Sequence, residues 1–190
     1  MRLFVALDIP EAVRENLAGM RRDFPSIGSQ LRWVPTQNFH VTLKFIGSVP
    51  PERLPSIIEA LRRVSLVEPV QLRIRGVGWL VNAKTGVILF ATVEDSKPLT
   101  ALATAIDQQL ERLGFTPENR AFMPHLTLVR ASRDLSAGSQ TALRELAEQH
   151  RQYDFGSMTT TEFHLIESKT LPTGPIYSKL QSFPLAAAGV

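Results

Sequence analysis

Apolar residues recur at two different spacings along the chain, and the change of spacing divides it into strands and helices. Near-alternating or continuous β-branched runs are typical of strands, and apolar residues three or four positions apart are typical of amphipathic helices. We expect strands at residues 3–9, 31–35, 39–46, 70–81, 86–93, 124–130, 158–168 and 176–183. We expect helices at residues 11–24, 52–65, 98–113 and 136–150. The interleaving of the two predicts an α+β fold.

Two of the expected strands, residues 39–46 and 124–130, carry the same four-residue pattern and are called the His–Thr strands below. The copies are His40, Val41, Thr42 and Leu43, and His125, Leu126, Thr127 and Leu128. Side chains alternate across a strand, so each histidine shares a face with its threonine while the apolar residues fill the other face. The imidazole and hydroxyl then lie roughly 6.5–7 Å apart along the strand, close enough to reach one small anion.

The position of the two motifs indicates an internal duplication. His40 and His125 are 85 residues apart, and Pro51 and Ser136, which open the following helices, are also 85 apart. Each half reads helix, His–Thr strand, helix and paired strands. We therefore expect residues 1–190 to form a single domain of two pseudo-symmetric, interlocked lobes. Each lobe should be an antiparallel sheet covered by helices, with the His–Thr strands facing each other across a cleft.

Composition narrows the chemistry further. Cysteine is absent, which excludes disulfides, thiolate metal sites and cysteine nucleophiles. Lys and Arg number 21 against 18 for Asp and Glu, a mild basic bias compatible with a polyanionic ligand. Asp8 interrupts the N-terminal apolar run too early for a signal peptide, and no stretch approaches the ~20 apolar residues of a membrane helix. We expect a cytoplasmic protein without a membrane partner.

A pair of histidines with two nearby hydroxyls suits in-line displacement at phosphorus. Histidine titrates near neutral pH, so one imidazole can accept a proton while the other donates one. Each such transfer is typically worth about 10²–10⁴ in rate. The threonine hydroxyls would donate hydrogen bonds to the non-bridging phosphate oxygens as charge builds there. The motifs thus predict acid–base catalysis, with His40, Thr42, His125 and Thr127 as the candidate catalytic residues.

A metal ion would be the other common use of paired histidines. Each motif supplies one histidine without a second His, Asp or Glu at ligand spacing, and the sequence contains no His-Glu-x-x-His motif. We therefore expect neither a metal nor a cofactor. A metal hydrolase would instead lose activity on chelation.

The sequence also resembles the 2H phosphoesterases, and more closely the bacterial and archaeal RNA 2′,3′-cyclic phosphodiesterases, formerly called 2′-5′ RNA ligases. The likeness lies in MRLFVALDIP, RWVPTQNFHVTLKFIG, GFTPENRAFMPHLTLVR and ESKTLPTGPIYSKLQSFPL. It implies two pseudo-symmetric α/β lobes with both motifs in the cleft, without metal or cofactor. It also implies His40 as the general acid on the leaving ribose oxygen, His125 as the base that activates water, and Thr42 and Thr127 as phosphate ligands.

The reaction that this resemblance implies opens a 2′,3′-cyclic phosphate at an RNA end to a 2′-phosphomonoester. The resemblance also implies a 2′-5′ ligation, in which a 5′-hydroxyl joins such an end through a 2′,5′ bond. The expected partner is RNA or an oligonucleotide with that end, bound by a monomer. Two alternatives stay open: a phosphodiesterase of small cyclic nucleotides or ADP-ribose cyclic phosphate, and a module that binds RNA ends without turnover. Binding alone would be served better by arginine, which holds phosphate bidentately.

Two basic residues near the motifs are candidate substrate ligands. Arg130 follows the second motif, but strict alternation places it opposite His125, so that only a bulge or strand end would turn it toward the site. A surface or interlobe ion pair is its alternative role. Lys44 is in phase with His40 and Thr42, which favours a side chain facing the cleft, although a solvated strand end is also open.

Aromatic residues could offer a ring on which a terminal base stacks. Tyr177 is the candidate that we assign to substrate binding, and Phe45, Phe122 and Trp33 are further possibilities. For aromatic residues in β-rich runs, packing in the core is the alternative. Arg120, just before the second motif, is a further candidate for a neighbouring phosphate.

Overall fold

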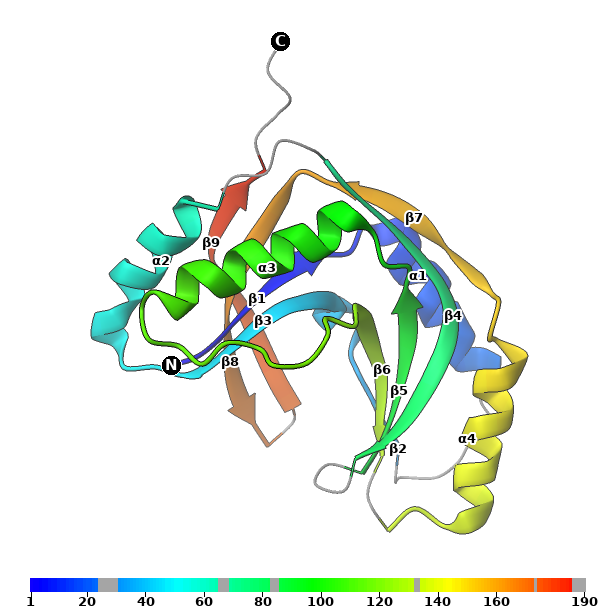
Figure 1. The fold of residues 1–190 in the computed structure, drawn as a ribbon. Helices are drawn as coiled ribbons and strands as arrows, with labels where there is room; N and C mark the ends of the chain where they lie inside the picture. Colours follow the sequence, from blue (N-terminus) through cyan, green and yellow to red (C-terminus); the bar gives the residue numbers. More distant parts are fainter. Residues whose placement is uncertain (24–30, 65–68, 83–85, 132–133, 173, 186–190) are drawn as a thin grey trace.

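In the part of the chain that the computed structural model describes, residues 1–23, 31–64, 69–82, 86–131, 134–172 and 174–185, strands of two antiparallel sheets alternate with helices (Figure 1). The strands are β1 (Arg2–Asp8), β2 (Leu31–Trp33), β3 (His40–Ser48), β4 (Val70–Asn82), β5 (Gly86–Val93), β6 (His125–Ala131), β7 (Asp154–Thr160), β8 (Glu162–Leu171) and β9 (Gly174–Pro184). The helices are α1 (Glu11–Gly19), α2 (Leu54–Arg62), α3 (Lys97–Glu111) and α4 (Ala137–Gln149), with 3₁₀ turns η1 (Met20–Asp23), η2 (Thr36–Asn38) and η3 (Pro51–Arg53).

Each His–Thr strand belongs to a different sheet. Sheet A has the strand order β3-β1-β8-β9, and sheet B has the order β2-β6-β5-β4-β7. Every neighbouring pair is antiparallel. The predicted α+β class with two antiparallel sheets is therefore confirmed, while the expected single domain with an internal duplication stays a prediction.

The sheets exchange strands between the two halves of the sequence. Sheet A joins β1 and β3 from the start of the chain to β8 and β9 from its end, whereas sheet B joins β2, β4 and β5 from the first half to β6 and β7 from the second. The hairpin of β4 and β5 that follows the first motif thus supports the second motif. Each site strand is consequently held by chain that lies far away in the sequence.

The helices cover the two sheets in pairs and enclose one large apolar core with two smaller clusters beside it. α2 and α3 contact each other and strands of sheet A, and α1 and α4 contact β7 and β4 of sheet B. The predicted inward faces are confirmed where they are described: Val13 and Leu17 of α1 and Ile57 and Leu61 of α2 are buried. Phe24, expected on the inner face of the first helix, lies outside the described residues.

One predicted element is wrong. The sequence predicts a single strand over residues 158–168, but β7 ends at Thr160 and β8 begins at Glu162, and the two strands belong to different sheets. The Thr160 hydroxyl donates a hydrogen bond to the Glu162 carbonyl (2.8 Å) across this corner. The backbone N–H of Leu185 bonds the Thr161 carbonyl (2.8 Å). These bonds stabilise a crossing between sheets that hydrophobic periodicity does not reveal.

Both His–Thr strands contain a β-bulge at the same place. Along β1 and β3 the register passes from Val5↔Lys44 to Ala6↔Thr42, which leaves Leu43 as the extra residue. Along β5 and β6 it passes from Leu89↔Val129 to Phe90↔Thr127, which leaves Leu128 extra. A bulge inverts the alternation of side chains beyond it. The fifth residue after each histidine therefore returns to the face of that histidine.

Candidate active site

The two His–Thr strands meet at the junction of the sheets. β3 and β6 contact each other, and Figure 1 shows the start of β3 in sheet A lying near the start of β6 in sheet B. His125 and Arg130 of β6 lie close enough to His40 of β3 for their positive charges to lower its pKa. The structure thus brings together two motifs that are separated by 85 residues in the sequence.

Both imidazoles are oriented by the same hydrogen bond. His40 Nδ1 lies 2.7 Å from the Asn38 carbonyl oxygen, and His125 Nδ1 lies 2.8 Å from the Met123 carbonyl oxygen. A carbonyl only accepts, so each Nδ1 carries its hydrogen and each Nε2 is left for proton transfer. A neutral ring then has a basic Nε2, and a protonated ring has an acidic one. Either histidine can take either role.

Burial shifts the acid–base balance of the first histidine. Removal from solvent lowers the pKa of His40 below its usual value, and the positive charges of Arg130, Arg14 and His125 lower it further. The Asn38 carbonyl acts in the opposite direction, because it stabilises the protonated ring. The net lowering means that His40 is neutral at pH 7 in the free protein.

Aromatic rings enclose His40 on the concave side of sheet A. Its ring centroid lies 4.9 Å from that of Phe4 and 5.2 Å from that of Tyr177, the latter edge to face. A small cavity of about 70 Å³ opens beside this cluster. The ten residues that line it are Leu7, Asp8, Gln37, Asn38, Phe39, His40, His164, Ile166, Tyr177 and Lys179.

A charged cluster borders the same cavity. The Asp8 carboxylate, in register with His40 across β1 and β3, pairs with Arg14 and with Lys179, whose Nζ lies 2.6 Å from Oδ2. Burial alone would raise the pKa of Asp8, but hydrogen bonds from Lys179 and the Ile9 N–H, together with the charges of Lys179 and Arg14, lower it overall. With two cations around one carboxylate, the cluster is positive.

The bulge decides where the basic candidates point. Arg130 is exposed on the same face of β6 as His125 and Thr127. The bulge at Leu128 is the one that the sequence analysis required for Arg130 to turn toward the site. The prediction that Lys44 faces the cleft with His40 is wrong. Lys44 is only 8% exposed, and its ammonium pairs with Asp107 and donates to the Thr116 carbonyl at 2.8 Å. The bulge at Leu43 turns it to the helix-covered face.

The same bulge exposes an aromatic ring at the site. Phe45 occupies in β3 the position that Arg130 occupies in β6, and 65% of it is exposed. Its centroid lies 6.0 Å from that of Phe4, within the cluster around His40. Tyr177 also lies in this cluster, 5.1 Å from Phe4. The alternative of a core position is therefore wrong for Phe45.

Several groups at the site are not evident from the sequence. Asn38 is buried and donates to the Pro175 carbonyl (2.9 Å), which fixes its own carbonyl against His40. The Met123 carbonyl, Asp8 and Arg14 complete the set. No motif marks them, because Asn38 and Met123 act through backbone oxygens, and Asp8 and Arg14 through an ion pair between β1 and α1. Only the equal spacing of Phe45 and Arg130 from the two histidines was available as a signal.

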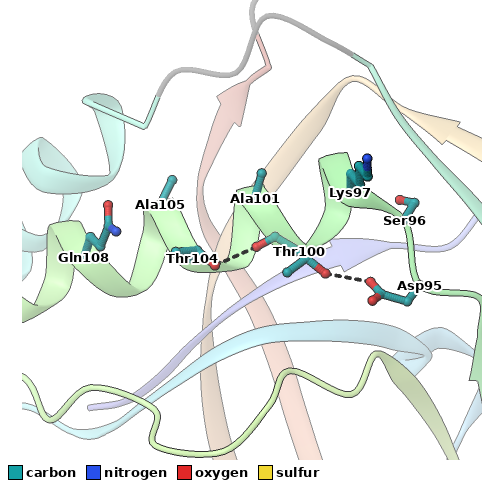
Figure 2. A pocket seen from close by; sticks show the side chains of 8 residues that line it. All are labelled: Asp95, Ser96, Lys97, Thr100, Ala101, Thr104, Ala105 and Gln108. Carbon is teal, nitrogen blue, oxygen red and sulfur yellow. Dashed lines mark hydrogen bonds between the residues drawn. The ribbon is translucent and has the colours of Figure 1, made fainter.

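A second hollow lies away from the motifs, along α3. Figure 2 shows side chains from Asp95 to Gln108 around it, with the Thr100 hydroxyl donating to Asp95 Oδ1 (2.6 Å) and the Thr104 hydroxyl donating to the Thr100 carbonyl (2.9 Å). None of its lining residues belongs to β3 or β6.

Among the described residues, no group of three or more His, Cys, Asp or Glu side chains is placed to hold a metal ion. None of the described helices combines the length and apolar character needed to cross a membrane.

Comparison with known proteins agrees with this geometry. The model of the family described as "LigT like Phosphoesterase" matches residues 7–88 and 91–177, and each segment contains one His–Thr motif. The chain belongs to the LigT-like phosphoesterase family. The proteins named RNA 2′,3′-cyclic phosphodiesterase from Methanothermobacter thermautotrophicus and Archaeoglobus fulgidus are each 31% identical to it. The alignments cover 97% and 96% of this chain and 99% of each relative.

Solved structures of LigT-like proteins share the fold over the whole chain. TT0787 of Thermus thermophilus superposes with a TM-score of 0.80 at 28% identity, covering all of both chains. LigT of E. coli, determined in complex with 3′-AMP, superposes with a TM-score of 0.75 at 27% identity, covering 97% of each chain. The matched segments of the LigT-like family include His40, His125, Arg130 and Tyr177.

Proposed function

We propose that the protein hydrolyses 2′,3′-cyclic phosphate ends of RNA to 2′-phosphomonoesters by acid–base catalysis with His40 and His125. The observation that carries the proposal is the matched orientation of the two imidazoles. Each donates Nδ1–H to the carbonyl two residues before it, so that two Nε2 atoms from different sheets are free for proton transfer. The printed names of the curated relatives, RNA 2′,3′-cyclic phosphodiesterase, support the substrate class.

In the proposed reaction, His125 Nε2 takes a proton from water as the water oxygen attacks phosphorus. The bond from phosphorus to the ribose 3′-oxygen breaks, and His40 Nε2 gives its proton to that oxygen, which leaves the phosphate on the 2′-oxygen. Thr42 and Thr127 hold the non-bridging oxygens, and Arg130 balances the charge that develops on them. With a 5′-hydroxyl in place of water as the nucleophile, the same two transfers would join the cyclic end to it through a 2′,5′ bond.

The acid role of His40 requires it to gain a proton with the substrate. Its pKa is lowered in the free protein, mainly by burial and then by the positive charges around it. A bound phosphodiester brings a negative charge beside the ring, which favours the protonated form. Substrate binding and protonation of His40 are therefore coupled in this mechanism, with His40 charging as the anion arrives.

The aromatic cluster beside His40 supplies the place for the terminal base. Phe45 presents an exposed face at the entrance, and Tyr177 lies deeper, against His40 and Phe4. Stacking on an aromatic ring is worth about 1–3 kcal/mol per base and tolerates any base. This arrangement fits RNA ends of varied sequence, bound by a monomer.

Product analysis tests the function directly. An RNA oligomer ending in a 2′,3′-cyclic phosphate is incubated with the protein in excess EDTA, beside His40→Ala and His125→Ala variants. We expect conversion to the 2′-phosphate by the wild type and a loss of about 10²–10⁴ in rate for each variant. Binding without conversion would contradict hydrolysis of RNA ends. Small cyclic nucleotides and ADP-ribose cyclic phosphate would then be tested, and a binding module would remain if these also stayed intact.

A further inference from the structure

Two arginines lie side by side on the open face of sheet B. Arg32 of β2 is in register with Arg130 of β6, and both are exposed. Residues directly opposite in an antiparallel pair project from the same face, with Cβ atoms about 4.5–5.5 Å apart. Leu31 and Trp33, on either side of Arg32, pack against the core, so Arg32 projects to the opposite face, that of Arg130. The pair therefore extends the active-site face toward the edge of the sheet.

This arrangement is electrostatically unfavourable in the free protein. Like charges directly opposite in a sheet repel each other and destabilise it. Among the ion pairs of the described residues, none includes Arg32 or Arg130. Elsewhere in sheet B, by contrast, Arg73 pairs with Asp154 at 2.6 Å. Two unbalanced arginines beside a phosphate site indicate a ligand with more than one phosphate.

Arg130 ties this pair to the reaction centre. Its positive charge lowers the pKa of His40 and opposes the rise that burial causes in the pKa of Tyr177, so its guanidinium lies near both rings. If Arg130 holds the reacting phosphate, Arg32 is one strand farther out. Guanidinium groups bind phosphate bidentately, and neighbouring strands can present two of them to consecutive phosphates.

We propose that Arg32 binds the phosphate on the 5′ side of the nucleotide that carries the cyclic phosphate. This subsite rests on the proposed function and specifies its substrate: an RNA end, or a nucleotide with a 5′-phosphate, is preferred over a nucleoside 2′,3′-cyclic phosphate with a free 5′-hydroxyl. Arg130 binds the reacting phosphate, and Arg32 binds a second phosphate where the substrate has one.

Three ligands test the subsite: adenosine 2′,3′-cyclic phosphate, the same nucleotide with a 5′-phosphate, and a dinucleotide that ends in it. We expect kcat/KM of the wild type to rise about tenfold when the 5′-phosphate is added, the value of one charge-assisted hydrogen bond. Arg32→Gln should remove this gain and leave the 5′-hydroxyl substrate unchanged. Arg73→Gln, at an exposed strand arginine of the same sheet, is the matched control and should keep the gain.

Two further measurements separate a binding role from a structural one. Arg32→Gln should unfold at the same or a higher temperature than the wild type, because it removes a like-charge contact. For an oligonucleotide, its log–log dependence of affinity on salt should be shallower by about 0.7, as expected for the loss of one phosphate contact on a single strand. Arg73→Gln should leave the salt dependence unchanged.

Binding of the same three ligands, measured by titration calorimetry, keeps failure of the subsite distinct from failure of the function. Ligands that bind with a 5′-phosphate preference but stay intact would contradict the proposed hydrolysis and support the subsite. Equal affinities and equal kcat/KM with and without the 5′-phosphate would overturn the subsite. An Arg32→Gln variant that retains the full preference would overturn it as well.

Discussion

From their histidines onward, β3 and β6 match position by position as far as Leu43 and Leu128, where each has its bulge. Both imidazoles donate Nδ1–H to the carbonyl two residues earlier. Beyond the bulge the strands differ. β3 continues with a buried lysine and an exposed phenylalanine, and β6 with a buried valine and an exposed arginine. The residues to which the proposed mechanism gives the proton transfers are duplicated, and those to which it gives substrate binding are not.

This comparison explains how a nearly symmetric site could bind its substrate in one orientation. The paired histidines and threonines alone would accept a phosphodiester in either direction. An aromatic ring at one end and a guanidinium at the other remove that ambiguity in the proposed mechanism, where the terminal base stacks on Phe45 and the phosphate binds Arg130. The buried faces of the two strands differ as well, since β3 has Lys44 where β6 has the uncharged Val129.

The largest effect is expected from removing Lys44, the charged residue that only β3 has on its buried face. Lys44→Met leaves the Asp107 carboxylate, only 21% exposed, without its ammonium partner. Loss of one partner of a buried pair is strongly destabilising, so we expect the free energy of unfolding to fall by about 3 kcal/mol in a urea titration. The double variant Lys44→Met/Asp107→Leu should recover most of this. A single variant as stable as the wild type would show that the pair contributes nothing to folding.

The outer asymmetry predicts two different losses of activity. Arg130→Gln should lower kcat/KM about 30-fold on a nucleotide and on a base-free cyclic phosphodiester alike, because it removes a charged hydrogen bond to phosphate.

Phe45→Leu keeps the apolar bulk but loses the ring, and should lower kcat/KM about tenfold on nucleotides only. Phe45→Trp is the control that should retain activity. Equal losses of Phe45→Leu on both substrates would contradict base stacking.

The smallest effect concerns pH and sharpens the assignment of roles. The pKa of His40 in the free protein is lowered, first by burial and then by its cationic neighbours. If His40 is the acid, kcat/KM should decline as pH rises through this value, with a midpoint below the usual histidine pKa of about 6.5. Arg130→Gln removes one positive neighbour and should move the midpoint upward. A limb that falls toward acid pH at that midpoint would instead make His40 the base.

The sequence revealed the chemistry of the site better than its surroundings. The repeated His–Thr pattern at a constant offset sufficed to predict both strands and their meeting at one site, and the interleaving of strands and helices predicted the α+β class. The local hydrophobic pattern could not disclose the bulge in β3, because Leu43 stands between Thr42 and Lys44 and alternates with them as in a regular strand. This is why strict alternation predicts the wrong face for Lys44 and a core position for Phe45. Arg32 and Asn38 are brought to the site by a cross-strand pairing and a backbone contact, which only the fold defines.

The exchange of strands between the halves also governs when the site can exist during synthesis. β1 and β3 emerge early, but their sheet includes β8 and β9, more than a hundred residues later in the chain. The sheet that carries His40 therefore stays incomplete until these strands have been synthesised, and contacts of such high sequence separation also form slowly. Tyr177 and the Pro175 carbonyl that holds Asn38 arrive with them. A nascent chain therefore contains both histidines before it contains the strands that complete the surroundings of His40.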